Sequence, residues 1–173
     1  MFTAEQAKGI AQLFITNLER ECETTKKVLA AVPQNQLNLK IGEKGRTARE
    51  LMVHIVESEI WFGEGIVSGQ FTHLEAEPAG PPTVAEIVAR FEKEVPALLA
   101  KVKTLSPEKL AQPQNFLNVF NLPALLYLSF WCNHTIHHRG QLSTYLRAMN
   151  ARVPSIYGGS ADEPFEMPAT AAT

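Results

Sequence analysis

Apolar residues recur at three- and four-residue intervals in four separate stretches of the chain, a spacing typical of one buried face of an α-helix. The four stretches are residues 4–32, 48–68, 84–105 and 123–150. Between them, the sequence lacks the strict alternation of apolar and polar residues that marks a half-buried β-strand. The pattern predicts an all-α protein, and a four-helix bundle is the simplest arrangement that buries every apolar face.

Local signals indicate where these helices begin and end. Three of them follow a capping box, in which a threonine precedes glutamine or glutamate by three residues: Thr3 with Gln6, Thr47 with Glu50, and Thr83 with Glu86. Pro33 should stop the first helix, and Pro96 should kink or locally break the third. The last helix is expected to end near Asn150, because asparagine tolerates the left-handed conformation that follows many helices.

The remaining segments are predicted to be connections. Polar or turn-forming residues dominate residues 33–46 and 78–82, and residues 111–121 look irregular. Pro107 should open a short turn at its first helical position. After the last helix the chain is expected to be extended, with residues 160–173 forming a tail.

Composition narrows the class of protein. The chain has 173 residues, 45% of them hydrophobic and 20% charged, which predicts a single globular domain over residues 1–173. A net charge of −2 gives no electrostatic reason to expect nucleic acid or a membrane surface as a partner. The two cysteines form no disulfide framework, and the sequence begins without the features of a signal peptide. We therefore expect a cytoplasmic protein.

The histidines are the residues most indicative of chemistry. His134, His137 and His138 fall within five residues of the predicted last helix. His134 and His138 lie one turn apart, so their rings share a face and can bind one transition-metal ion. Such an ion needs a third protein ligand, and the best donor is His54 in the predicted second helix. Spacing alone leaves two alternatives open: His137 in place of His138, or histidines that bind no metal.

Two residues near the histidines are candidates for catalysis. Glu57 follows His54 by three residues, and it is either an acid–base group near the metal or a surface carboxylate. Arg139 follows His138 directly. Its guanidinium group either binds a carboxylate of a substrate or pairs with an acidic residue across the bundle.

Five further residues are expected around the site. Trp61 and Trp131 either form the wall of a pocket or pack in the core. Gln141 is placed to orient a ligand, and Tyr145 to reach a cavity. Gly140 is expected to allow another helix to approach closely.

The string His134-x-x-x-His138-Arg139-Gly140-Gln141-Leu142, followed by Val153-Pro154-Ser155-Ile156-Tyr157-Gly158, resembles the DinB/YfiT-like superfamily. The capped helix that carries His54 fits the same pattern. The resemblance implies a four-helix bundle that holds a divalent metal through three histidines, here His54, His134 and His138. It makes His137 the additional histidine. Asn150 departs from the family, because many relatives have glycine at that helix end.

The resemblance also implies a cofactor, partners and a reaction. The metal would be nickel or zinc, with manganese or iron as alternatives. The partners would be a small-molecule substrate, a low-molecular-weight thiol and a second copy of the chain in a homodimer. Some relatives are thiol S-transferases that use bacillithiol, others are mycothiol-dependent isomerases, and the family name refers to damage-inducible expression.

An ion held by three neutral imidazoles keeps a coordination position open, as in catalytic zinc sites. Because a metal lowers the pKa of a thiol that binds it, the predicted function is transfer of a low-molecular-weight thiol to an electrophilic substrate. The alternatives are metal-dependent hydrolysis, in which the ion activates water, and a non-enzymatic metal-binding protein of the stress response.

Overall fold

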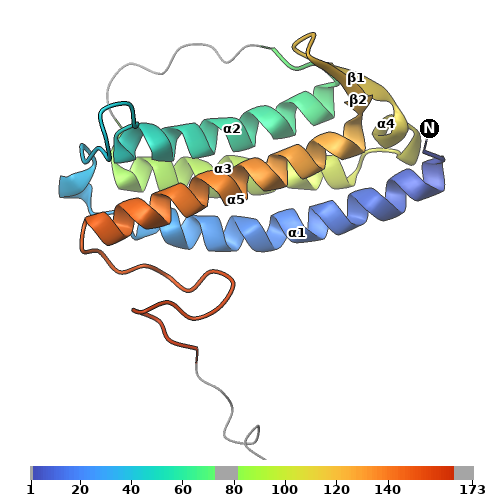
Figure 1. The fold of residues 1–173 in the computed structure, drawn as a ribbon. Helices are drawn as coiled ribbons and strands as arrows, with labels where there is room; N and C mark the ends of the chain where they lie inside the picture. The colour runs from blue at the N-terminus through green and yellow to red at the C-terminus, as the bar shows by residue number, and fades with distance from the viewer. Residues whose placement is uncertain (1, 73–81, 166–173) are drawn as a thin grey trace, which may run out of the picture.

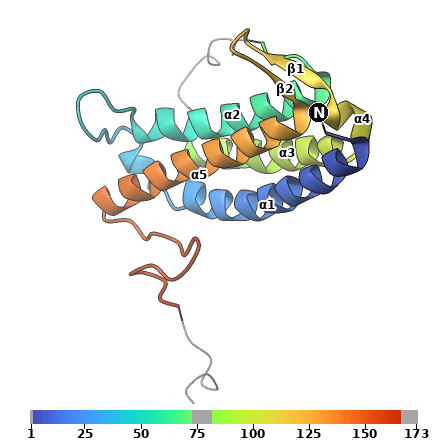
Figure 2. The ribbon, with the colours of Figure 1, turned by 45° about the vertical axis from the view of Figure 1, so that its right-hand side comes forward.

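The computed structural model describes residues 2–72 and 82–165, and four long helices dominate this part of the chain. They are α1 (Ala4–Ala30), α2 (Ala48–Ser68), α3 (Val84–Lys103) and α5 (Ala124–Ala148). Helices α1 and α2 each pack against both α3 and α5, so the four form a closed bundle (Figures 1 and 2). The four-helix bundle predicted from the apolar pattern is confirmed.

The predicted capping boxes form at the start of α1, α2 and α3. At α2, the backbone N–H of Glu50 donates to Thr47 Oγ1 (3.2 Å), and the backbone N–H of Thr47 donates to Glu50 Oε2 (2.6 Å). These bonds satisfy helix-end donors that would otherwise be unpaired. At the C-terminal end of α5, Asn150 has a φ of 53°, which is the left-handed conformation expected there.

Of the two outcomes expected at Pro96, a local break of the helix is not observed, and a kink stays a prediction. Helix α3 continues across Pro96 without a break, although proline lacks the N–H needed for one helical hydrogen bond. The residues on either side of it, Val95, Leu98 and Leu99, are buried in the core, and this packing holds the helix together. Pro107 does open a short helix, α4 (Pro107–Ala111), at its first position as expected.

The segment predicted to be irregular contains a β-hairpin, and that prediction was wrong. Strand β1 (Pro113–Phe116) pairs with β2 (Phe120–Pro123) in antiparallel register, with Phe116 opposite Phe120. Strands of four residues are too short for alternation to be read from sequence. The hairpin is tied to α5 by Tyr127, whose Oη donates to the carbonyl of Gln114 (2.8 Å) and accepts from the N–H of Leu122 (3.1 Å).

The two ends of the bundle differ. One end carries the β-hairpin, and the other brings together the start of α2, the end of α5 and the loop that precedes α2 (Figure 1). That loop includes a short 3₁₀-helix, Gln34–Gln36, and is closed by a bridge between Lys40 and Thr47. None of the helices in the described part of the chain has an apolar stretch long enough to cross a bilayer.

Candidate metal centre

The structure brings together three of the histidines singled out in the sequence. His54 lies on α2, and His134 and His138 lie one turn apart on the face of α5 that packs against α2. The ring centroids are 5.0 Å apart for His54 and His134, 4.5 Å for His54 and His138, and 4.3 Å for His134 and His138. Each ring offers one nitrogen, and these three atoms all lie within 4.8 Å of one another. We call this group the histidine cluster.

Hydrogen bonds orient two of the rings. Nδ1 of His138 lies 2.7 Å from Oε1 of Gln141. An amide oxygen only accepts, so Nδ1 carries the proton and Nε2 keeps a free lone pair. That Nε2 atom lies 3.2 Å from Nε2 of His54, whose Nδ1 faces Ser58 Oγ at 3.5 Å. Two nitrogens bound to one tetrahedral zinc ion are roughly 3.3 Å apart, so the observed spacing fits a shared ion.

The cluster also has the right protonation state for a metal. Burial is the largest cause that lowers the pKa of His54 to about 4 and that of His134 to about 3, and the charges of neighbouring groups, Arg46 among them, contribute to these values. The pKa of His138 is lowered mainly by burial. All three rings are therefore neutral at pH 7, which is the form in which imidazole binds a divalent ion. The donor set and its protonation fit a borderline transition metal such as zinc or nickel.

The other histidines of the sequence do not join the cluster. The side chain of His137 is exposed, and although its ring centroid is 4.7 Å from that of His138, it is not among the nitrogens that converge. Of the two pairs that spacing allowed, the structure gathers His134 with His138. His73 lies outside the described residues.

Glu57 has a different partner from the one that an acid–base role would need. Its Oε1 accepts from Nη1 of Arg90 on α3, an ion pair in which both side chains are partly exposed. The proposed role of Glu57 near a metal stays a prediction, and the observed contact does not support it.

Arg139 is buried, with 1% of its surface exposed, and its guanidinium group is fully engaged inside the protein. Nη1 pairs with Oε2 of Glu21 on α1, and Nη2 donates to Oη of Tyr157 (2.7 Å). Tyr157 in turn donates to the same oxygen of Glu21 (2.9 Å). Arg139 thus has the second of the two roles considered for it, a pairing across the bundle.

Sequence reasoning missed a buried glutamate. Glu59 is 1% exposed, and its carboxylate accepts from Trp131 Nε1 (2.5 Å) and from the hydroxyl of Thr135, the residue after His134. Burial raises the pKa of Glu59 to about 7. The signal was present in the sequence, because Glu59 falls on the apolar stripe of α2 between Ile55 and Phe62.

The expectations for the two tryptophans and for Gly140 had different outcomes. Trp131 is fully buried and belongs to the core, whereas Trp61 is partly buried and donates to the carbonyl of Thr72 (2.5 Å) near the β-hairpin. A Cβ at Gly140 would meet nothing within 4 Å, so the expectation of close helix approach was wrong there. The close approach occurs at Gly63, where a Cβ would lie 2.9 Å from Leu98 Cβ.

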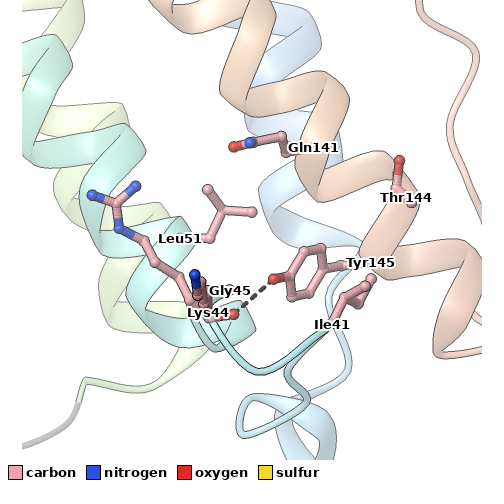
Figure 3. Close-up of a pocket in the computed structure, with 8 residues that line it drawn as sticks. Ile41, Lys44, Gly45, Leu51, Gln141, Thr144 and Tyr145 are labelled. Atoms are coloured by element: carbon pink, nitrogen blue, oxygen red, sulfur yellow. Dashed lines mark hydrogen bonds between the residues drawn. The ribbon is translucent and has the colours of Figure 1, made fainter.

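A cavity of about 550 Å³ lies beside the cluster, at the end of the bundle where α2 begins and α5 ends (Figure 3). It is lined by residues of the loop before α2 and of the two helices: Ile41, Lys44, Gly45, Arg46, Leu51, Gln141, Thr144 and Tyr145. Tyr145 reaches the cavity as expected, and its Oη donates to the carbonyl of Arg46 (2.7 Å). The loop residues were missed, because a polar connection gives no sequence signal for a binding surface.

Comparisons with known proteins agree with this architecture. The sequence model of the DinB family matches residues 1–167. The uncharacterized protein YrdA of Bacillus subtilis (strain 168) is 26% identical over 155 residues, which cover 87% of this chain and 89% of YrdA.

Two solved structures share the fold. A DinB-like protein of Bacillus cereus ATCC 10987 matches with a TM-score of 0.72 at 23% identity, over 83% of this chain and 95% of that chain. The DinB-like protein YjoA of Bacillus subtilis matches with a TM-score of 0.67 at 19% identity, over 88% of this chain and 99% of that chain. The family match spans nearly the whole sequence, and the chain belongs to the DinB family.

Proposed function

We propose that this protein binds a divalent transition metal through His54, His134 and His138, and that it joins a low-molecular-weight thiol to an electrophilic substrate. The observation that carries the proposal is the histidine cluster, in which three neutral imidazoles from two helices place one nitrogen each within 4.8 Å of the others. All three side chains are only partly buried, so a small molecule can reach an ion held there. Nickel and zinc are the proposed ions, with manganese and iron as alternatives.

The chain's own residues prepare the site in three ways. Gln141 holds the proton of His138 on Nδ1 and leaves Nε2 free to bind. Burial keeps His54 and His134 unprotonated at neutral pH, so no proton has to leave before an ion binds. The packing of α2 against α5 brings His54 to the pair on α5.

A divalent ion at this site would lower the pKa of an incoming thiol and so supply a thiolate at neutral pH. The thiol gives its proton to solvent. The sulfur electron pair then forms a bond to an electrophilic carbon of the substrate, and the leaving group departs with the electrons of its own bond. The cavity beside the histidine cluster offers room for the rest of either reactant.

Hydrolysis is the less favoured reaction. Attack by water is helped by a nearby base, and Glu57, the candidate for that role, is paired with Arg90. Among the residues that the structure describes, the possible metal-binding group contains histidines alone. A purely structural role for the ion would not account for the cavity beside the histidine cluster.

The metal site is tested on protein purified without an affinity tag. We expect about one equivalent of nickel or zinc per chain by elemental analysis, and loss of the ion in His134→Gln. His137→Gln is the matched control. It removes an exposed imidazole that follows His134 by three residues on α5 but does not belong to the histidine cluster, so this variant should keep the ion. Retention of the ion in His134→Gln would overturn the ligand assignment.

The reaction is tested on the metal-loaded protein. Incubation with a panel of small thiols and either a chloro-dinitroaromatic compound or an epoxide should give thioether product in the wild type and in His137→Gln. The product should be absent with His134→Gln. Turnover of ester substrates without any thiol would favour hydrolysis, and an ion with no turnover of either kind would favour a non-enzymatic role.

The assembly and cellular setting are also proposals that rest on the family resemblance. We infer a homodimer, which sedimentation velocity tests directly, in a cytoplasmic protein whose expression rises after DNA damage. We also infer that residues 1–173 fold as a single domain, for which one cooperative unfolding transition is expected.

A further inference from the structure

The loop before α2 forms one wall of the cavity described above. Its ends are joined by the bridge between Lys40 and Thr47, and the hydrogen bond from Tyr145 Oη fixes the carbonyl of Arg46. Gly45 allows this path, because a Cβ there would lie 2.3 Å from the carbonyl oxygen of Ile41 and 3.3 Å from Tyr145 Oη. The backbone of the loop is therefore held against α5 by specific contacts, with Lys44 and Arg46 at the cavity.

The cavity lining is positively charged. It contains Lys44 and Arg46 and no aspartate or glutamate, although the whole chain has a net charge of −2. In the part of the chain that the structure describes, neither cation lies within ion-pair distance of a carboxylate. The nearby carboxylate of Glu50 accepts from the backbone N–H of Thr47 in the capping box (2.6 Å). The two cations are thus available to a ligand.

Two residues of the cavity lining lie next to the histidine cluster, although none of the three histidines lines the cavity itself. Gln141 lines the cavity and also accepts the hydrogen bond from His138 Nδ1 (2.7 Å). Leu51, another lining residue, precedes His54 by one turn of α2. Figure 3 shows Gln141 extending from α5 toward Leu51, with Tyr145 below it.

We infer that this cavity binds the anionic end, a carboxylate or a phosphate, of the small molecule whose reactive group reaches the histidine cluster. Arg46 is the main partner of that group, and Lys44 adds a second positive charge. Arginine suits this role because its planar guanidinium group can donate two parallel hydrogen bonds to a carboxylate or phosphate. The inference rests on the proposed function for the identity of the reacting group, and on the cavity itself for the anion.

The first experiment uses protein loaded with Co²⁺ and two small thiols. 3-Mercaptopropionate carries a carboxylate and 2-mercaptoethanol does not, and the sulfur-to-cobalt absorption band reports binding of either one. We expect Arg46→Gln to weaken the binding affinity for 3-mercaptopropionate roughly tenfold, which is the size of effect typical of losing a hydrogen bond to a charged group. Binding of 2-mercaptoethanol should not change. Because each thiol is compared with itself, its intrinsic acidity cancels.

Two further variants sharpen this comparison. Lys44→Gln should show a smaller effect of the same sign, since lysine presents a single point charge. Arg20→Gln is the matched control, because it removes an exposed arginine of α1 outside the cavity lining and should change neither affinity. Equal loss of both thiols in Arg46→Gln, or no loss of either, would overturn the anion subsite while the thiol reaction stands.

The second experiment separates the subsite from the thiol reaction. Zinc-loaded protein is titrated with propionate and with methylphosphonate, and the side-chain amide NMR signals of Gln141 are followed. Saturable shifts that disappear in Arg46→Gln support the subsite even if no thiol ever binds the metal, and the tighter of the two anions identifies the chemistry preferred. No saturable shift with either anion would overturn the inference.

Discussion

The amide oxygen of Gln141 lies 2.7 Å from Nδ1 of His138, one turn away on the same helix. This contact sets the tautomer of the ring and leaves Nε2, which lies 3.2 Å from Nε2 of His54, free for a metal. A residue outside the cluster thereby controls how the cluster presents its lone pairs.

Replacing Gln141 with leucine should therefore weaken the metal site. We expect a loss of about tenfold in zinc affinity, the lower end of the range for removal of such an orienting hydrogen bond. Competition with a chromophoric chelator measures it. Gln141→Glu retains the acceptor and should bind at least as tightly as the wild type; wild-type affinity in Gln141→Leu would show that the contact has no orienting role.

Acid should destabilise the metal-free protein through the cluster. The pKa of His54 is lowered to about 4 and that of His134 to about 3, from 6.5 in the unfolded chain. Below pH 6.5 the unfolded state binds more protons, so the free energy of unfolding falls as pH drops through this window. Urea unfolding at pH 7.5, 6 and 5 should show this loss, and His134→Gln should reduce it. An equal loss of unfolding free energy in the wild type and in His134→Gln would show that the histidine cluster is not the source of the pH dependence.

Glu59 should make the free energy of unfolding fall as pH rises, which is opposite to the effect of the histidine cluster. Its pKa rises from 4.5 to about 7 in the folded protein, so its contribution to stability is complete below pH 4.5 and is lost as pH increases to about 7. Glu59→Gln keeps the shape without the charge. Relative to the wild type, the variant should gain about 3 kcal/mol in unfolding free energy between pH 4.5 and pH 8.

Calorimetry or urea titration at the two pH values measures this gain. Glu64→Gln is the control, because Glu64 lies on the same helix but faces solvent. If Glu59→Gln and the wild type changed in parallel with pH, the carboxyl of Glu59 would have the same pKa in the folded protein as in the unfolded chain, contrary to its burial.

Arg139 should matter for stability and not for direct metal binding. Arg139→Met leaves the carboxylate of Glu21 buried beside Tyr157 without its cation, and removing one partner of a buried pair costs about 3–5 kcal/mol. Tyr157→Phe removes two hydrogen bonds and should cost roughly 1–2 kcal/mol. Zinc affinity of the folded Tyr157→Phe protein should match the wild type, and a large loss there would give the network a role at the metal.

Two of the helical glycines, Gly63 and Gly140, should respond in opposite ways to replacement by alanine. Gly63→Ala places a Cβ 2.9 Å from Leu98 Cβ and 3.1 Å from Trp131 Cη2, so overpacking should cost about 1–3 kcal/mol. Gly140→Ala meets nothing within 4 Å and should gain up to about 1 kcal/mol from helix propensity. Chemical denaturation of both variants measures the two values, and the same sign in both would contradict the packing described here.

Much of the fold was predictable because its signals are local. The threonine capping boxes and the periodic apolar residues identify the helices, and Asn150 marks the end of the last one. The hairpin at Pro113–Pro123 was not predictable, because its pairing depends on Tyr127 and on aromatic packing from other elements. Continuity of α3 across Pro96 likewise depends on tertiary burial and not on local preference.

The candidate site also combines features that local spacing predicts with features that depend on tertiary packing. Helical spacing paired His134 with either of two histidines, and only packing of α2 on α5 shows which of them faces His54. Pairing of Arg139 with Glu21 joins residues far apart in sequence, and the two ends of that contact have no common local pattern. Arg46 lies in a polar loop whose role depends entirely on the surface against which the loop is held.

The bridge between Lys40 and Thr47 has an evolutionary consequence. Thr47 also begins α2, so the start of the helix that carries His54 is fixed independently of what lies between the bridged residues. Replacements of exposed side chains in this loop, such as Lys44 and Arg46, would therefore alter the cavity lining without moving the imidazoles. On the proposed function, this separation would let the substrate preference of the protein change while its metal site stayed the same.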